Sequence, residues 1–172
     1  MDKIGVFYGP EKGSTEKVAQ MIVELLGTQV AEVHSIEKAT PEDLLAYKTL
    51  ILGVATVGRD TWETEHGQRG WDVFLPKLSA ETSFEGIKVA VYGLGNHLLY
   101  PTMFCDAMGT LAIDMRNRKA TLCGSVETDT YTFEDSAAIE NGLFLGLPLD
   151  EDVEPELTKS RLVTWLENLA WV

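Results

Sequence analysis

The residues best suited to chemistry stand near the start of the chain. A short apolar segment runs into a turn that contains Gly9, Gly13, Ser14 and Thr15, and an amphipathic helical pattern follows at once. The first N–H groups of a helix have no partner within the helix, and the helix dipole favours an anion at that end. Hydroxyl side chains add further donors. This turn therefore predicts a binding site for the phosphate of a ligand.

Strand and helix patterns that alternate along the chain would position this turn. The predicted strands are 3–8, 30–34, 49–54, 88–93 and 120–126, and the predicted helices are 14–26, a short one after Thr40, 71–78, 103–117 and one from 157 with Thr158 as its N-cap. The central strands are continuously apolar, which indicates burial on both faces. Five such units predict an α/β fold, a doubly wound five-stranded parallel sheet, in one domain of 172 residues.

The last strand of this sheet is expected to be split by an insertion. A polar segment, 127–141, separates two strand-like pieces, 120–126 and 143–147. Ligands of doubly wound sheets lie beyond the carboxyl ends of the strands. Here those ends carry the loops 9–15, 55–70 and 94–101, so these three loops are the predicted ligand site.

The composition excludes several classes of protein. A net charge of −13 disfavours nucleic acid and favours basic protein partners. No apolar run of 18 residues is present, so no membrane span is expected. The N-terminus lacks a signal-peptide layout, and Cys105 and Cys123 lack metal-ligand spacing. We expect two buried thiols and a cytoplasmic protein.

Other constellations are weak. No Gly-x-Ser-x-Gly motif is present, so Ser14 and Thr15 are predicted to be phosphate ligands rather than nucleophiles. The acidic run 150–152 is expected to be a solvated turn. No metal site is predicted, because the histidines are scattered at His34, His66 and His97.

Several motifs taken together resemble the flavodoxins, over nearly the whole chain. They are Gly13-x-Thr15, Trp71-Asp72-x-Phe74-Leu75-Pro76, Gly93-Leu94-Gly95-Asn96 with Tyr100, Phe104-Cys105-Asp106-Ala107 and the run 142–152. The split last strand resembles the long-chain branch of that family. The resemblance implies a monomeric, low-potential carrier of single electrons that binds FMN and shuttles electrons between redox proteins.

The resemblance also implies where FMN would lie, and the chain departs from the family there. Pro10 and Lys12 stand where hydroxyl residues are usual, and Lys12 is expected to pair with the phosphate. Val57 replaces a tryptophan that covers the flavin ring, which leaves Trp62 as an alternative cover. The predicted cofactor contacts are Gly9, Pro10, Glu11, Lys12, Gly13, Ser14, Thr15, Ala55, Thr56, Val57, Gly58, Trp62, Gly95, Asn96, Tyr100 and Asp129.

Three of these residues have more specific expected roles. Gly58 is placed at the peptide beside the flavin N5 that turns over on reduction, since glycine reaches positive φ without strain. Asn96, where the family often has Asp, is expected to bond the polar edge of the ring, and Tyr100 is expected to stack on it. The acids at 60, 63 and 65, beside the presumed flavin, are expected to dock basic redox partners.

Two other functions stay open on the sequence alone. The altered residues Pro10, Lys12 and Val57 are compatible with a regulatory or protein-binding module that binds FMN weakly or not at all. An FMN-dependent reductase is the other alternative, although only the segment 127–141 offers material for a second substrate site. A yellow purified protein would exclude the module, and NAD(P)H oxidation by the protein alone would identify a reductase.

Overall fold

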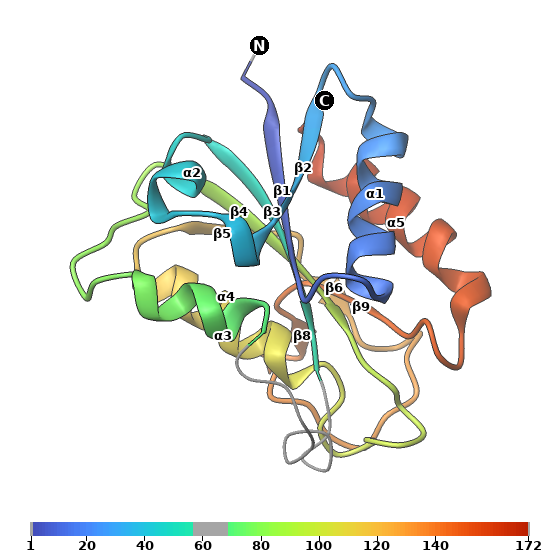
Figure 1. Cartoon of the computed structure of the whole chain (residues 1–172). Coiled ribbons are helices and arrows are strands. Elements are labelled where there is room, and N and C mark those ends of the chain that lie inside the picture. Colours follow the sequence, from blue (N-terminus) through green and yellow to red (C-terminus); the bar gives the residue numbers. More distant parts are fainter. Residues whose placement is uncertain (1, 57–68, 172) are drawn as a thin grey trace.

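The sheet at the centre of the protein is parallel and has the strand order β2-β1-β3-β4-β5 (Figure 1). The computed structural model describes residues 2–56 and 69–171. Its main strands are β1 (Ile4–Gly9), β2 (Ala31–Ser35), β3 (Thr49–Ala55), β4 (Lys88–Leu94) and β5 (Thr121–Cys123). The predicted α/β fold with a five-stranded parallel sheet is confirmed.

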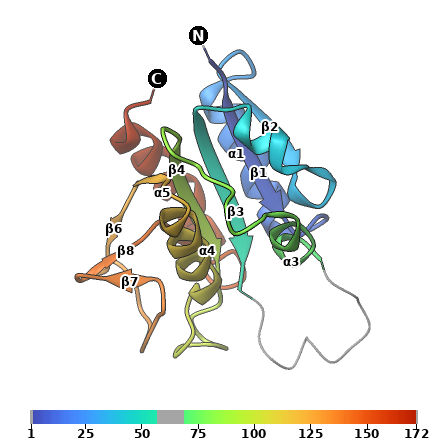
Figure 2. The same ribbon diagram turned by 90° about the vertical axis from the view of Figure 1, so that its left-hand side faces the viewer.

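Helices cover both faces of this sheet, as Figures 1 and 2 show. On one face lie α1 (Ser14–Leu26) and α5 (Pro155–Leu169), and on the other lie α3 (Trp71–Phe74) and α4 (Asp106–Asn117). Neighbouring side chains of β1 lie on opposite faces of the sheet and belong to two different hydrophobic cores. Phe7 packs with α3 and α4, whereas Val6 and Tyr8 pack with α1 and α5. Burial on both faces explains why the central strands carry no polar alternation.

The last strand is split, as predicted, but its second half lies later than expected. β5 pairs with residues 88–90 of β4, and β9 (Leu147–Leu149) pairs with residues 92–94 of the same strand. Gly124, at φ 81°, turns the chain out of the sheet, so the strand predicted over 120–126 ends early. The intervening segment forms a small antiparallel sheet of β6 (Val126–Glu127), β7 (Ile139–Glu140) and β8 (Leu143–Phe144), beside β4 and α4 (Figure 2).

Two helices do not begin where the sequence predicted. The last helix begins at Pro155, since proline at the first helical position needs no N–H partner. Thr158 is therefore not its N-cap but lies inside the helix, where its hydroxyl donates to Glu151 Oε2 at 2.8 Å. The helix predicted from 103 begins only at Asp106, because Cys105 takes a left-handed conformation at φ 55°.

The other elements follow the prediction closely, with one exception. The short helix α2 (Pro41–Leu45) opens with a complete capping box between Thr40 and Asp43. The helix predicted over 71–78 is shorter than expected: the α-helical part ends at Phe74, and a 3₁₀ turn, Leu75–Lys77, follows. Pro76 lacks an N–H group and cannot continue the α-helical hydrogen bonds.

The cysteines and the helix lengths bear on two further expectations. Cys105 is fully buried, whereas Cys123 is only partly buried, so the prediction of two buried thiols is half wrong. Within residues 2–56 and 69–171, the helices are all too short or too polar to cross a bilayer.

Candidate functional site

The candidate site is the edge of the sheet where β1, β3 and β4 end and three loops meet. Two hydrogen bonds of Thr56 tie the second loop to its neighbours. The Thr56 N–H donates to the Leu94 carbonyl at 2.8 Å, and its hydroxyl oxygen accepts from the Ala107 N–H at the start of α4 at 2.9 Å. Thr56, a predicted cofactor contact, therefore also positions the loops around the site.

The first loop is held by a close approach of two glycines. A Cβ atom on Gly9 would lie 2.6 Å from Ile36 Cγ2 and 2.8 Å from the Gly70 Cα, so no larger residue fits there. The Gly70 N–H donates to Glu37 Oε1 at 2.8 Å. The turn between β1 and α1 is thereby packed against the segment that leads into α3.

The N-terminus of α1 carries the free donors that an anion needs. Gly13 is the N-cap residue and supplies no side-chain cap. Among the described residues, no acceptor pairs with the N–H groups of residues 13–16. A shallow hollow of about 460 Å³ lies over this end, lined by Lys12, Gly13, Ser14, Glu16, Lys17 and Gln20. Free amides, the Ser14 hydroxyl and a lysine fit the phosphate of FMN.

Two other amides of the predicted phosphate loop already have partners. The Glu11 N–H donates to Glu37 Oε1 at 3.4 Å, and the Lys12 N–H donates to Glu16 Oε2 at 2.6 Å. The sequence offered no sign of these two carboxylates. The donors available to a phosphate are therefore those of residues 13–16 rather than the whole of 11–15.

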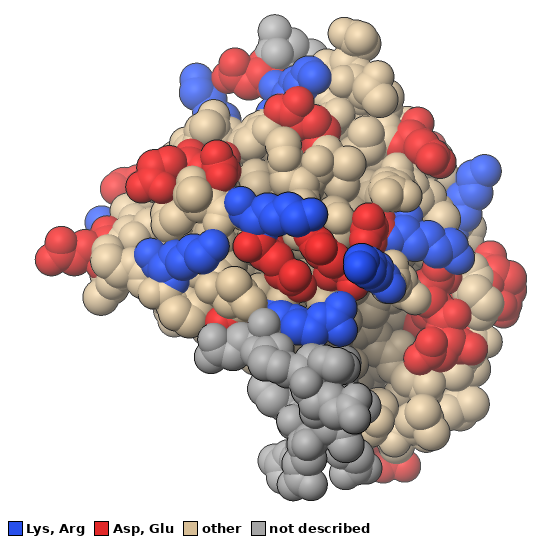
Figure 3. Space-filling model, in the orientation of Figure 1, with Lys and Arg blue, Asp and Glu red and all other residues tan. Residues whose placement is uncertain are grey.

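Charges of both signs surround the first loop. Lys38 Nζ lies 3.0 Å from Glu11 Oε1, Lys17 Nζ lies 3.0 Å from Glu151 Oε1, and Arg69 donates to the Glu11 carbonyl at 3.1 Å. Figure 3 shows acidic and basic side chains intermingled on this face of the molecule. Below the loop, burial and the nearby Glu16 carboxylate raise the pKa of Tyr8 to about 12.

The third loop is shaped mainly by Asn96, which is 8% exposed. Its Oδ1 accepts from the N–H groups of Leu98 and Leu99 at 3.1 and 2.9 Å, and its Nδ2 donates to Asp152 Oδ2 at 3.2 Å. Both polar groups of the Asn96 side chain, the amide oxygen and the amide nitrogen, are thus already hydrogen-bonded within the protein. Tyr100, at the end of the loop, is half-buried.

For some predicted site residues, a role at these loops stays a prediction. Asp129 is exposed, and within the part of the chain that the structure describes no hydrogen bond or ion pair joins it to the first or third loop. Its neighbour Thr130 instead accepts from Arg161 of α5 at 3.4 Å. Val57, Gly58 and Trp62 lie outside the described residues, as do the acids at 60, 63 and 65.

A buried pair beside the third loop was not predicted. The Asp150 carboxylate is 0% exposed and lies 2.6 Å from Nδ1 of His97. The acidic run 150–152 is a turn, as predicted, but only Asp152 is exposed: Asp150 is buried, and the Glu151 side chain is nearly buried beside Lys17. The two residues of the pair are 53 positions apart, so no local pattern links them. No cluster of three or more potential metal ligands exists in the described ranges.

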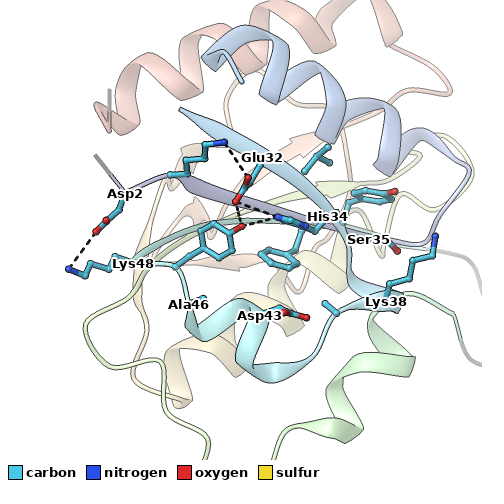
Figure 4. Close-up of a pocket in the computed structure, with 14 residues that line it drawn as sticks. Asp2, Glu32, His34, Ser35, Lys38, Asp43, Ala46 and Lys48 are labelled. Atoms are coloured by element: carbon cyan, nitrogen blue, oxygen red, sulfur yellow. Dashed lines mark hydrogen bonds and ion pairs between the residues drawn. The ribbon is translucent and has the colours of Figure 1, made fainter. Parts of the chain in front are cut away.

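A second hollow, of about 830 Å³, lies along the outer strand β2 and α2 (Figure 4). Two of its lysines pair with acids of the same hollow: Lys3 with Glu32 at 3.3 Å, and Lys48 with Asp2 at 3.5 Å. The Tyr47 hydroxyl donates to Glu32 and lies 2.8 Å from His34 Nε2. Because these groups satisfy each other, the hollow offers little to a ligand compared with the free amides of α1.

Comparisons with known proteins match nearly the whole chain. The family model described as Flavodoxin matches residues 6–165. The chain is 41% identical over 168 residues to the flavodoxin of Klebsiella pneumoniae, covering 97% of this chain and 92% of the relative. It is also 41% identical over 167 residues to flavodoxin 1 of Escherichia coli (strain K12), covering 96% and 92%.

A solved structure is similar in fold over the same length. It is the crystal structure of Fusobacterium nucleatum flavodoxin bound to flavin mononucleotide. The two structures agree with a TM-score of 0.82 at 26% sequence identity, over 97% of this chain and 96% of that chain.

Proposed function

The chain belongs to the flavodoxin family, and we propose that it carries electrons by means of FMN held at the three loops. The family predicted from the sequence is confirmed. Its named relatives are electron-transfer proteins rather than enzymes. The observation that carries the proposal is the row of free N–H groups at the start of α1.

These amides would hold the cofactor phosphate. The N–H groups of residues 13–16 would face the phosphate, with the positive end of the α1 dipole behind them. Ser14 and Thr15 add hydroxyl donors, and Lys12 adds a charge. Since Glu16 and Glu37 already bond the two preceding amides, they fix the loop in the conformation that presents the others.

The other two loops would hold the flavin ring, with Tyr100 against one face. FMN supplies one-electron redox chemistry when it is bound. The chain's part is to orient the ring, exclude water from it and set its potential. The net charge of −13 disfavours the addition of an electron to a nearby group, so we expect a low potential.

Redox partners would dock transiently at this edge. The acidity of the chain favours partners with a basic face. Leu98 and Leu99, 66% and 70% exposed, stand in the third loop and supply apolar contact area there. We propose that the chain works as a monomer in the cytoplasm, where its two free cysteines stay reduced.

The test is a reconstituted electron-transfer chain. The purified protein, loaded with FMN, should pass electrons from an NADPH-dependent flavodoxin reductase to cytochrome c. It should oxidise no NADPH when the reductase is left out. Turnover of NADPH by the protein alone would instead identify an FMN-dependent reductase, and a protein that stays colourless with FMN would favour a binding module.

A further inference from the structure

The third loop needs an anchor, because it must hold its residues in place without regular secondary structure. Gly95 to Tyr100 lie between β4 and α4. Two hydrogen bonds, from Asn96 to Asp152 and from the Gly95 N–H to the Leu149 carbonyl at 3.0 Å, link this loop to the chain that leaves β9. Both of these hydrogen bonds start from adjacent residues, Gly95 and Asn96, at the beginning of the loop. The orientation of the rest of the loop must therefore be set by other contacts.

The anchor is the carboxylate of Asp150. Its Oδ2 accepts from the His97 N–H at 3.0 Å and lies 2.6 Å from His97 Nδ1. Its Oδ1 accepts from the N–H groups of Asp152 and Val153 at 3.2 and 2.9 Å. One oxygen thus binds the third loop, and the other shapes the turn after β9.

The surroundings bury this pair. The Asp150 side chain is 0% exposed and that of His97 is 9% exposed. A carboxylate only accepts, so Nδ1 of His97 carries the hydrogen whether the ring is neutral or charged. The ring also packs edge-on against Phe104, with centroids 6.3 Å apart. Hydrogen bonds to a buried carboxylate are stronger than neutral ones, and breaking one leaves a buried group unsatisfied.

We propose that His97 and Asp150 are positioning residues for the flavin ring. This inference rests on the proposed function, since it takes the third loop to be the one that contacts the ring. His97 is fixed from both its backbone and its side chain, so Asn96 before it and Tyr100 after it are held at set positions. The pair acts on the ring through the loop, whereas the end of α1 acts on the phosphate.

The test compares FMN with riboflavin, which has the ring but no phosphate. His97→Leu removes the side-chain donor, and His97→Asn restores one, because the Asn amide nitrogen occupies nearly the place of Nδ1. We expect His97→Leu to weaken both ligands by a similar factor of about tenfold, which equals about 1.4 kcal/mol. We expect His97→Asn to recover most of the loss. The visible circular dichroism spectrum of the bound flavin should change in His97→Leu and return towards that of the wild type in His97→Asn.

Controls separate this role from simple stabilisation. His34→Leu removes a histidine from the outer strand β2 and should leave both affinities unchanged. The binding titrations are carried out well below the unfolding temperature, so that a lower affinity cannot come from loss of folded protein. If His97→Leu does not fold, His97→Ala takes its place. Unchanged riboflavin affinity, or loss for FMN alone, would overturn the proposal. If the wild type binds neither flavin, the proposed function itself fails.

Discussion

Lys12 combines a charge with an unusual backbone conformation. Its φ is 62°, in the left-handed region where a residue with a Cβ is strained. It is exposed and borders the hollow over the start of α1. From the sequence we predicted that the Lys12 charge pairs with the phosphate, but no pattern indicated the left-handed backbone. Two substitutions can therefore separate the two properties.

We expect Lys12→Gln and Lys12→Gly to weaken FMN binding and to flatten its salt dependence, because both remove a charge beside the phosphate. Only Lys12→Gly should also raise the free energy of unfolding of the FMN-free protein, by about 1 kcal/mol, since it relieves the strain. Calorimetric titration at several salt concentrations and urea unfolding measure the two effects. The matched control is Lys159→Gln, which removes the charge of an exposed lysine on α5. Unchanged affinity and salt response in Lys12→Gln would show that Lys12 is merely solvated.

At the scale of elements, the contact between β4 and α1 supports the phosphate site from below. Tyr92 of β4 is fully buried, and its hydroxyl donates to the Thr15 carbonyl at 2.7 Å. Its ring fills the space that a Cβ on Gly53 of β3 would need. Burial raises the pKa of Tyr92 well above its ordinary value of 10.0.

This burial gives Tyr92→Phe a pH-dependent effect. At pH 7 the variant should be less stable by about 1 kcal/mol, because one hydrogen bond is lost. Above about pH 10 the unfolded wild type releases the tyrosine proton while the folded protein keeps it, so wild-type stability falls by up to about 1.4 kcal/mol per pH unit. The phenylalanine variant lacks this contribution. The difference between the two proteins should therefore shrink and vanish near about pH 11.

Urea unfolding of both proteins at pH 7, 10 and 11 measures this. The other tyrosines whose pKa is raised, Tyr8, Tyr47 and Tyr131, are present in both proteins, so their own titration largely cancels in the difference. A deficit that stays constant across this range would mean that Tyr92 ionises as readily in the folded as in the unfolded protein.

The elements that could be predicted from the sequence are those whose conformation depends on residues close together in the chain. Apolar runs and the Thr40 cap depend on neighbouring residues, so β1, β3, β4 and α2 were predicted closely. The start of α4 was predicted too early, because no local pattern indicated that Cys105 would take a left-handed conformation. The turn between β1 and α1 was predicted for the same local reason as the strands, whereas its role as a phosphate site stays a prediction. The His97–Asp150 pair was not predicted, because it joins residues brought together only by the fold.

At the scale of the whole molecule, charge governs encounters. The net charge of −13 should attract a basic reductase over distances beyond direct contact. Figure 3 shows that one face carries mixed charges, so the attraction need not act equally from all sides. Exposed charges are screened by salt within about 10 Å at 0.1 M.

We therefore expect the rate of electron transfer from a basic reductase to fall steeply as ionic strength rises. Stopped-flow measurements between low and physiological salt give this slope. Reduction by a small uncharged mediator is the control, and its rate should hardly change. A reductase rate that does not depend on salt would mean that the acidity serves only to keep the protein dispersed.

The central claim is that the start of α1 binds the FMN phosphate, and the affinities for FMN and riboflavin test it most directly. The measurement compares the wild type with Ser14→Ala/Thr15→Ala and with the control Ser160→Ala/Thr164→Ala on α5. The wild type should prefer FMN, and the first double variant should reduce that preference by about tenfold or more, since hydrogen bonds to a charged phosphate are strong. The control should keep it. Equal losses for both ligands, or no preference in the wild type, would contradict the claim.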